Sequence, residues 1–138
     1  TKQVPKQQQE QQPTYRIVSP PYLNLRDEYG EEIAQRLFSA EALEIFRQEA
    51  TAIPQWTPWP ETQHYSLGPN GETTWTVFPL CYCFPAHDVS QRTWVDQTRH
   101  FCPKTCALLE SILGDTLRTA LFSQLRPQTT LEAHTGWA

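Results

Sequence analysis

The end of the chain carries the residues whose types and spacing could do chemistry. His134 is followed by Thr135 and Gly136. Non-haem iron is commonly held by two histidines and one carboxylate, and the acid often lies two positions after the first histidine. Gly136 occupies that position, so the usual three-residue site is not present. From the residues alone, His134 is either a metal ligand or a strand-end histidine that donates a hydrogen bond.

Four cysteines could form a different kind of site. Cys81 and Cys83 make one pair, and Cys102 and Cys106 make another. Their thiolates could hold zinc or close disulfides in a small structural module, but neither spacing is the usual Cys-x-x-Cys of a zinc knuckle. The alternative, which we favour for Cys83 and Cys106, is burial as small apolar residues. The sequence leaves the redox compartment open.

The remaining ionisable side chains indicate no catalytic pair. Carboxylates in polar or helical contexts are expected to form a solvated face; they are Asp88, Asp96, Glu110 and Asp115. Three further histidines fall in predicted loops, where we expect exposure rather than metal ligation; they are His64, His87 and His100.

The length and charge of the chain limit the classes of protein to which it can belong. The chain has 138 residues and a net charge of −4, without a basic stripe, which argues against a nucleic-acid partner. No apolar run approaches membrane-spanning length and no signal peptide is visible. Because the chain starts with Thr, an upstream targeting or anchor segment stays open. We expect a soluble domain of the cytoplasm or, with such an anchor, of the endoplasmic reticulum lumen.

The most polar stretch lies at the N-terminus. Residues 2–12 contain Gln at six of eleven positions, and such a stretch cannot bury enough apolar surface to offset its ordering entropy. We therefore predict a disordered Gln-rich tail or linker over residues 1–13 and a folded domain over residues 14–138.

Helical patterns come first within that domain. Acidic residues and apolar spacing predict a helix over residues 27–37. Ser39 is a plausible N-cap for a second helix that runs to about residue 51, and Pro54 ends it. Residues 55–72 are then mostly loop, with a strong turn signal at 68–71.

Strand patterns follow, with one helix among them. Residues 75–83 have strand composition, and residues 86–100 are a polar loop with a short helical turn. Pro103 suits the first turn of a helix over residues 105–113, and Gly114 is a natural stop. Residues 120–125 and 131–134 are predicted to be two strands joined across 127–129. The order of elements predicts an α+β fold that ends in a β-rich core.

Four segments of the chain, in order, resemble the aspartyl/asparaginyl β-hydroxylase family. The segments are WTVFPL at 75–80, CPKTCALLE at 102–110, LFSQL at 121–125 and PQTTLEAHTG at 127–136. They are similar to the family's Trp-x-x-Phe-x-Leu strand, Cys-Pro-Lys-Thr…Leu-Leu helix, Phe-Ser-x-Leu strand and Pro-Gly-Thr…Pro-His-x-Gly signature. The resemblance covers about the last 60 residues and becomes specific through the order of its segments.

This resemblance implies a chemistry and a fold. Family members are thought to hold iron with two histidines, with a Gly where the acid would be, so Gly136 fits and His134 matches the first ligand. Ser123 matches a residue that binds the distal carboxylate of 2-oxoglutarate, and Trp75 matches an aromatic that lines the substrate cleft. The implied fold has N-terminal helices leading into the first strands of a double-stranded β-helix (jelly-roll, cupin-like) core, incomplete at its C-terminus.

The implied activity is that of an Fe(II)- and 2-oxoglutarate-dependent dioxygenase. O2 and 2-oxoglutarate would be consumed, succinate and carbon dioxide released, and an unactivated C–H bond hydroxylated, in an Asp/Asn-type side chain of a protein, peptide or small-molecule substrate. The family's second iron histidine and its 2-oxoglutarate arginine would fall beyond Ala138, so the chain by itself is expected to be inactive. A catalytically inactive interaction domain of the same fold is the main alternative.

Three positions depart from the family pattern. Gln128 replaces the Gly of Pro-Gly-Thr, so we expect a turn that needs no Gly-only conformation. Ala133 replaces the Pro before His134, and Val77 stands where some members have a polar substrate contact. These departures leave the specificity for Asp or Asn open.

Overall fold

The structure is a computed structural model that describes residues 25–134. The predicted tail at residues 1–13, the boundary at residue 14, and Thr135 and Gly136 lie outside the described residues. The helices and strands are α1 (Leu25–Tyr29), α2 (Glu31–Leu37), α3 (Ala40–Thr51), β1 (Thr57–Pro58), β2 (Trp75–Cys83), β3 (Arg92–Trp94), α4 (Asp96–Phe101), α5 (Pro103–Leu113) and β4 (Ala120–Leu125). Short 3-10 helices lie at Thr62–His64, Val89–Gln91 and Gly114–Thr116. The predicted α+β class is confirmed.

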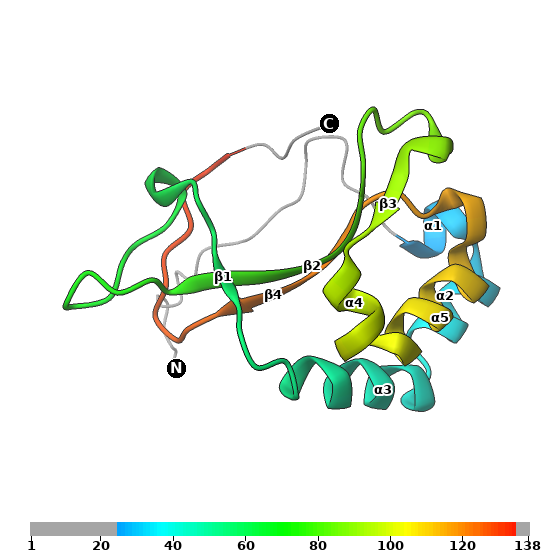
Figure 1. Ribbon diagram of the computed structural model, residues 1–138, viewed down its shortest axis with the longest axis horizontal. Helices are drawn as coiled ribbons and strands as arrows, with labels where there is room; N and C mark the ends of the chain where they lie inside the picture. The colour runs from blue at the N-terminus through cyan, green and yellow to red at the C-terminus, as the bar shows by residue number, and fades with distance from the viewer. Residues whose placement is uncertain (1–24, 135–138) are drawn as a thin grey trace, which may run out of the picture. The chain divides into compact units, whose positions relative to one another are not determined.

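β2 is the central strand of a four-stranded antiparallel sheet. β4 runs along one edge of β2, from the pair Trp75–Leu125 to the pair Cys81–Ala120. β1 and β3 pair with opposite ends of the other edge of β2. A bulge in β2 lies between Pro79 and Cys81, where proline has no N–H to donate to the ladder. The long strands β2 and β4 form the twisted centre of the sheet, which we call the platform (Figure 1).

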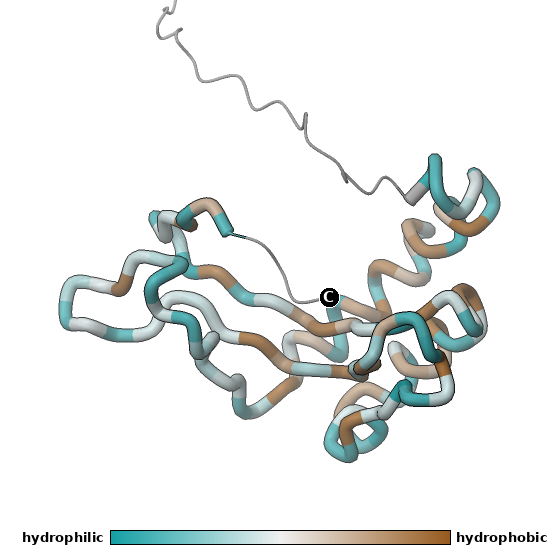
Figure 2. Tube along the Cα trace, turned by 90° about the horizontal axis from the view of Figure 1, so that it is seen from above, coloured by the Kyte–Doolittle hydropathy of each residue, from teal (hydrophilic) through white to brown (hydrophobic). Residues whose placement is uncertain are grey.

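One face of this platform is covered by helices. Phe78 and Leu80 point from β2 into a core cluster with Ile53 and Cys102. Partly buried side chains complete the cluster: Trp56, Trp94, Phe101, Leu109, Ala120 and Phe122. Figure 1 shows α3, α4 and α5 together on this side of the sheet, and Figure 2 shows hydrophobic segments recurring along the strands. Because side chains alternate along a strand, Trp75 and Val77 project to the other face.

A carboxylate ties two of the covering helices together. Two backbone N–H groups in the first turn of α5, those of Lys104 and Thr105, donate to the two carboxylate oxygens of Glu49 on α3, at 3.0 and 2.6 Å. Cys102, the N-cap residue of α5, makes no side-chain capping bond. Glu49 therefore satisfies first-turn N–H groups and places negative charge at the positive end of the helix.

Several predicted elements are confirmed. Ser39 caps α3 by accepting a hydrogen bond from the Ala42 N–H at 3.1 Å. The strand at 75–83 and the strand at 120–125 appear with the predicted bounds. α5 runs from Pro103 to Leu113 and is closed by Gly114, whose φ of +54° with ψ of −131° suits glycine.

The single helix predicted over residues 27–37 is wrong. Two helices, α1 and α2, lie on either side of Gly30, which adopts a φ of +92°. The Gly30 N–H donates to the Arg26 carbonyl at 3.0 Å, which closes α1 in the manner of a left-handed glycine cap.

Two predicted loops contain regular structure. Residues 55–72 include β1 and the 3-10 helix Thr62–His64. Residues 86–100 include β3, and the short helical turn predicted there is present as α4, which extends to Phe101. The short strands form because the long strand β2 offers an edge for pairing, which local composition does not reveal.

The strand predicted at 131–134 is also wrong. Leu131 makes one isolated antiparallel bridge, to Tyr65, and no hairpin with β4 forms. The turn before it differs from expectation as well. Gln128 has a φ of +67°, so this position does adopt the left-handed conformation that glycine favours.

The four cysteines are buried and free. This agrees with the expectation for Cys83 and Cys106 and gives no disulfide among Cys81, Cys83, Cys102 and Cys106. Burial raises the pKa of the Cys102 thiol to about 11, so the thiol is neutral at physiological pH. Among residues 25–134, no group of three His, Cys, Asp or Glu residues is arranged to hold a metal ion. Within the same range, no helix has the length and apolar character that crossing a membrane requires.

Candidate functional site

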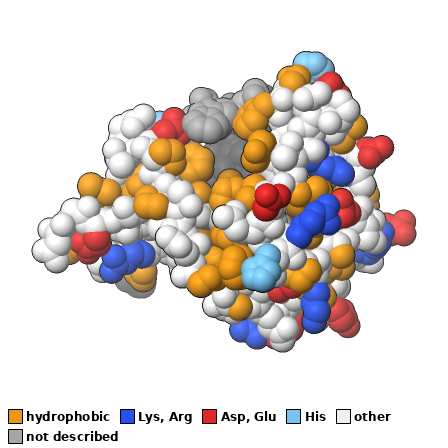
Figure 3. All heavy atoms as spheres, viewed as in Figure 1, with side chains coloured by type: hydrophobic (Ala, Val, Ile, Leu, Met, Phe, Trp, Pro, Cys, Tyr) orange, Lys and Arg blue, Asp and Glu red, His pale blue; other side chains and the backbone are white. Residues whose placement is uncertain are grey.

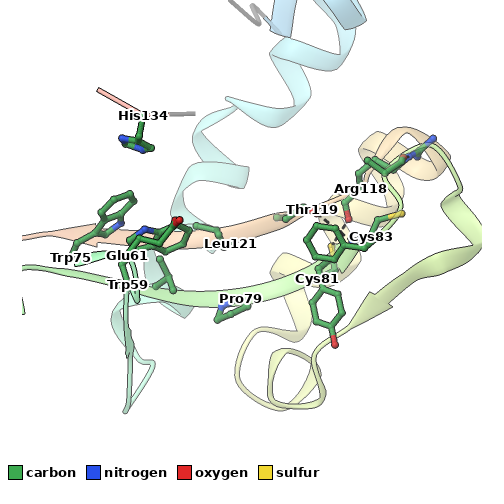
Figure 4. A pocket seen from close by; sticks show the side chains of 15 residues that line it. Trp59, Glu61, Trp75, Pro79, Cys81, Cys83, Arg118, Thr119, Leu121 and His134 are labelled. Carbon is green, nitrogen blue, oxygen red and sulfur yellow. Dashed lines mark hydrogen bonds between the residues drawn. The ribbon is translucent and has the colours of Figure 1, made fainter. Parts of the chain in front are cut away.

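A cavity of about 640 Å³ opens on the face of the sheet that the helices do not cover. Its floor comes from side chains of β2 and β4, including Val77, Pro79 and Leu121. Figure 4 shows the two ends of this cavity. His134, Trp75, Glu61 and Trp59 gather at one, and Arg118, Thr119, Cys81 and Cys83 gather at the other. The apolar floor between them makes the cavity a trough with polar groups at each end.

His134 reaches the cavity because two distant segments pair. The Ser66 N–H donates to the Thr130 carbonyl at 2.9 Å, and the Glu132 N–H donates to the His64 carbonyl at 2.8 Å. The Thr130 N–H also donates to Ser66 Oγ, at 2.9 Å. These bonds flank the Tyr65–Leu131 bridge. The backbone leading to His134 is thus docked on residues 64–66.

The His134 ring has a defined hydrogen bond. Its Nδ1 lies 2.7 Å from the carbonyl oxygen of Glu132. A carbonyl oxygen only accepts, so Nδ1 carries the proton and donates it. In the neutral ring, Nε2 then keeps its lone pair. Histidines that bind metals usually donate their other ring N–H to a carbonyl or carboxylate in this way.

Trp75 lies beside this histidine and is hydrogen-bonded to Ser123. The Trp75 indole N–H donates to Ser123 Oγ at 2.8 Å, and the Trp75 ring centroid is 5.9 Å from that of His134. Ser123 stands opposite Val77 in the ladder, so its side chain shares the open face of the sheet. Trp75 thus contacts each of the other two residues that the sequence singled out. Ser123 does not line this cavity; it lines a second hollow with Ala50, Thr51 and Trp56.

An aromatic wall supports Trp75. The Trp59 ring stacks on it at a centroid distance of 4.7 Å and an interplanar angle of 15°. Tyr65 meets it edge-on at 5.5 Å, and the Tyr65 hydroxyl donates to the Trp59 carbonyl at 2.7 Å. β1 positions Trp59, whose N–H donates to the Trp75 carbonyl at 2.9 Å. Stacked and edge-on aromatic pairs of this kind resist rotation of the rings they contain.

The prediction that His64 is an exposed loop residue is wrong. Its side chain is 17% exposed, and its ring stacks on that of His134 at a centroid distance of 4.6 Å and an angle of 13°. Glu61 Oε1 lies 3.6 Å from His64 Nδ1. Sequence reasoning missed Trp59, Glu61 and His64. The tryptophan-rich run at 56–60 was the single local signal, and nothing local connects His64 with His134.

The far end of the cavity is organised by Arg118. Its Nε donates to the Ala86 carbonyl at 2.6 Å, and its guanidinium also donates to the Asp115 carbonyl. Thr119 Oγ1 accepts from the Cys83 N–H at 3.3 Å. Arg118 therefore cross-links two loops at this end of the trough.

Several large hydrophobic side chains are exposed at the surface, both in the cavity and outside it. The large ones with at least 39% exposure are Phe38, Leu43, Leu67, Tyr82, Phe84, Leu121, Leu125 and Leu131. In the space-filling view of Figure 3, orange side chains come to the surface around the middle of the visible face. Of these exposed residues, Tyr82, Phe84 and Leu121 belong to the lining of the cavity.

As a metal centre, this site offers His134, although among the described residues no group of three His, Cys, Asp or Glu residues is arranged to hold a metal ion. His134 has the tautomer and the backbone partner of a metal-binding histidine. Ser123 adds a hydroxyl that still has its proton to donate, because its oxygen accepts from Trp75. An iron ion at His134 would need its other ligands from outside residues 25–134 or from co-substrate and water.

Comparison with family models identifies the class of protein. The model of the aspartyl/asparaginyl beta-hydroxylase family matches residues 40–138, and the chain belongs to this family. The match spans β2, α5, β4 and the whole neighbourhood of His134. Neither the curated proteins nor the solved structures contain a significant match to the chain.

Proposed function

We propose that the chain carries part of the active site of an Fe(II)- and 2-oxoglutarate-dependent dioxygenase that hydroxylates an unactivated C–H bond of an Asp/Asn-type side chain. β2 and β4 would be early strands of a double-stranded β-helix. The observation that carries the proposal is His134, whose Nδ1–H is bound to the Glu132 carbonyl at the end of an apolar trough, in a chain of a hydroxylase family.

Each residue has a role that its geometry supports. His134 would bind iron through Nε2, because Nδ1 is already used as a donor. Ser123 would donate its hydroxyl proton to a carboxylate of 2-oxoglutarate, since its oxygen accepts from the Trp75 indole. Trp75 would form a wall of the substrate cleft. When bound, iron and 2-oxoglutarate together would supply the activation of O2.

The apolar floor of the trough would serve this chemistry by excluding water. Val77 is buried, and Pro79 and Leu121 continue the floor along the strands. A site with few waters strengthens the electrostatic interactions of bound charged groups and limits side reactions. The described residues thus provide an aromatic wall, an apolar floor and His134 as a candidate metal ligand.

The test measures conversion of 2-oxoglutarate to succinate by the full-length protein with Fe(II). We expect turnover in the wild type and its loss in His134→Ala. His87→Ala is the matched control, because His87 is exposed and does not line the cavity. Undiminished turnover in His134→Ala would remove His134 from the iron site, and loss of turnover in both variants would point to a non-specific effect.

A second candidate is a binding domain of the same fold that does not catalyse. The mostly apolar floor of the trough favours it. Titration of the metal-free full-length protein with Co(II) separates the two candidates. An enzyme of this class binds Co(II) through His134, whereas a non-catalytic domain shows no binding that depends on His134.

A further inference from the structure

His64 and His134 form a stacked pair of imidazoles at the end of the trough. Their ring centroids are 4.6 Å apart and their planes differ by 13°. The two residues are 70 positions apart in the chain, so the pair arises from tertiary structure. The His134 side chain is otherwise exposed, and Trp75, its other aromatic neighbour, meets it at a tilt of 51° and a distance of 5.9 Å. The close, parallel partner of His134 is His64.

We propose that His64 is a positioning residue that holds the plane of the His134 imidazole for metal binding. This inference rests on the proposed function of His134 as an iron ligand. It assigns to His64 no contact with the metal, the co-substrate or the substrate.

The stack and the hydrogen bond restrain different motions of the ring. The bond from Nδ1 to the Glu132 carbonyl, at 2.7 Å, restrains the direction in which that edge of the ring points. A single bond of this kind still allows the ring to tilt about the donor–acceptor line. A parallel neighbour at 4.6 Å opposes tilting, because any tilt drives one edge of the ring into the His64 face. Together they set the direction of the Nε2 lone pair.

His64 is itself held well enough to act as a support. Its carbonyl accepts from the Glu132 N–H at 2.8 Å, and its own N–H donates to the Glu61 carbonyl at 3.0 Å. Its side chain is 17% exposed and lies beside the Glu61 carboxylate. The first of these bonds joins the backbones of His64 and Glu132, two residues before His134. The backbone that carries the His64 ring is therefore joined directly to the backbone that leads to His134.

The stack leaves Nε2 of His134, the atom proposed to bind the metal, free. In a face-to-face pair the ring edges, where the nitrogens lie, point away from the partner. His64 can thus restrain His134 without competing for Nε2. Partners that orient a metal ligand typically change metal affinity by about 10- to 100-fold when removed.

The experiment measures Co(II) affinity of the metal-free full-length protein by titration, for wild type and three variants of residue 64. His64→Phe keeps a flat ring without ring nitrogens. His64→Gln keeps a polar side chain without a ring, and His64→Ala removes both. We expect His64→Phe to bind Co(II) within about threefold of the wild type, and the Gln and Ala variants to bind about tenfold or more weakly.

A metal-free measurement separates positioning from folding. The thermal unfolding midpoint of each metal-free variant reports overall stability, and the Cε1–H resonance of His134 reports loss of the neighbouring ring. Positioning predicts a displaced His134 resonance in His64→Gln and His64→Ala at unchanged unfolding midpoints, with the Phe variant retaining a ring-current shift. If His64→Ala does not fold, the comparison of Phe with Gln carries the test.

The outcomes distinguish this inference from the proposed function. Wild-type affinity in His64→Gln or His64→Ala overturns the positioning role, as does a Phe variant as weak as Ala. If those variants bind like wild type while His134→Ala does not bind, the proposed function stands and the role of His64 falls. If the wild type binds no Co(II), or His134→Ala binds it equally well, both are overturned.

Discussion

The two faces of the same sheet differ in what their side chains contact. On the covered face, Leu80 of β2 is 2% exposed and packs in the cluster beneath α3 and α5. On the open face, Leu121 of β4 is 39% exposed and lines the trough that ends at His134. The two residues are neighbours in space, since β2 and β4 pair directly. Alternation along the strands alone separates them.

This difference shows that one face of a small sheet can provide most of the buried core while the other face carries the candidate site. The covered face buries large side chains, and buried apolar area is the main source of stability. The open face holds polar donors, aromatic rings and apolar side chains such as Leu121 that are only partly buried. Changes on the two faces should therefore separate the free energy of unfolding from metal binding.

The largest expected effect on stability comes from Leu80→Ala. Removing a buried leucine side chain leaves a cavity, and we expect the free energy of unfolding to fall by roughly 2–5 kcal/mol. Denaturant unfolding of the metal-free protein measures this. Leu121→Ala is the matched control and should cost about 1 kcal/mol or less, because Leu121 is partly exposed. Equal losses in the two variants would contradict the division between the faces.

Glu49→Ala should have the next largest effect. Glu49 accepts from two N–H groups at the start of α5, and losing a charged cap of this kind should lower the free energy of unfolding by about 1–2 kcal/mol. Co(II) affinity should not change, since Glu49 lies with the covering helices. Glu44→Ala, an exposed change on the same helix, is the control and should leave the unfolding midpoint close to that of wild type. A change in metal affinity in Glu49→Ala would show that the helical face reaches the site.

The Trp75–Ser123 hydrogen bond should contribute a smaller amount. A double-mutant cycle with Trp75→Phe and Ser123→Ala should give a coupling energy of about 1 kcal/mol in unfolding experiments. If Ser123 binds 2-oxoglutarate as proposed, Ser123→Ala should also raise the concentration of 2-oxoglutarate needed for half-maximal turnover. A coupling energy near zero would mean that the two side chains do not interact in solution.

Gln128→Gly should have the smallest effect, and it should stabilise the protein. Gln128 has a φ of +67°, which costs a side chain more than it costs glycine, so we expect a gain of about 0.5–1 kcal/mol after the entropy of glycine is counted. Gln128→Asn should gain less, and Gln128→Val should lose stability, because a β-branched residue resists this conformation. A loss of stability in Gln128→Gly would argue against a left-handed turn before His134.

Local sequence patterns were sufficient to predict the elements that are determined by residue composition and by helix-ending residues. β2 was predictable because Val, Phe, Tyr and Trp cluster over nine residues, and α5 because Pro103 and Gly114 mark its ends. The break at Gly30 and the conformation of Gln128 were missed. Gly30 stands within a helical pattern of charged and apolar residues, which hides the break, and the surroundings of Gln128 impose a backbone conformation that its residue type does not indicate.

The sequence by itself determined which residues of the site to consider. His134, Ser123 and Trp75 stood out through residue type and the order of four motifs, and the family match over residues 40–138 agrees with that order. Tertiary structure alone decided that Trp75 contacts both Ser123 and His134, that residues 64–66 dock on residues 130–132, and that His64 stacks on His134. The reason is physical: periodicity and propensity encode contacts within a few residues, whereas pairing across nearly 70 positions depends on how β2 and β4 bring the segments beside them together.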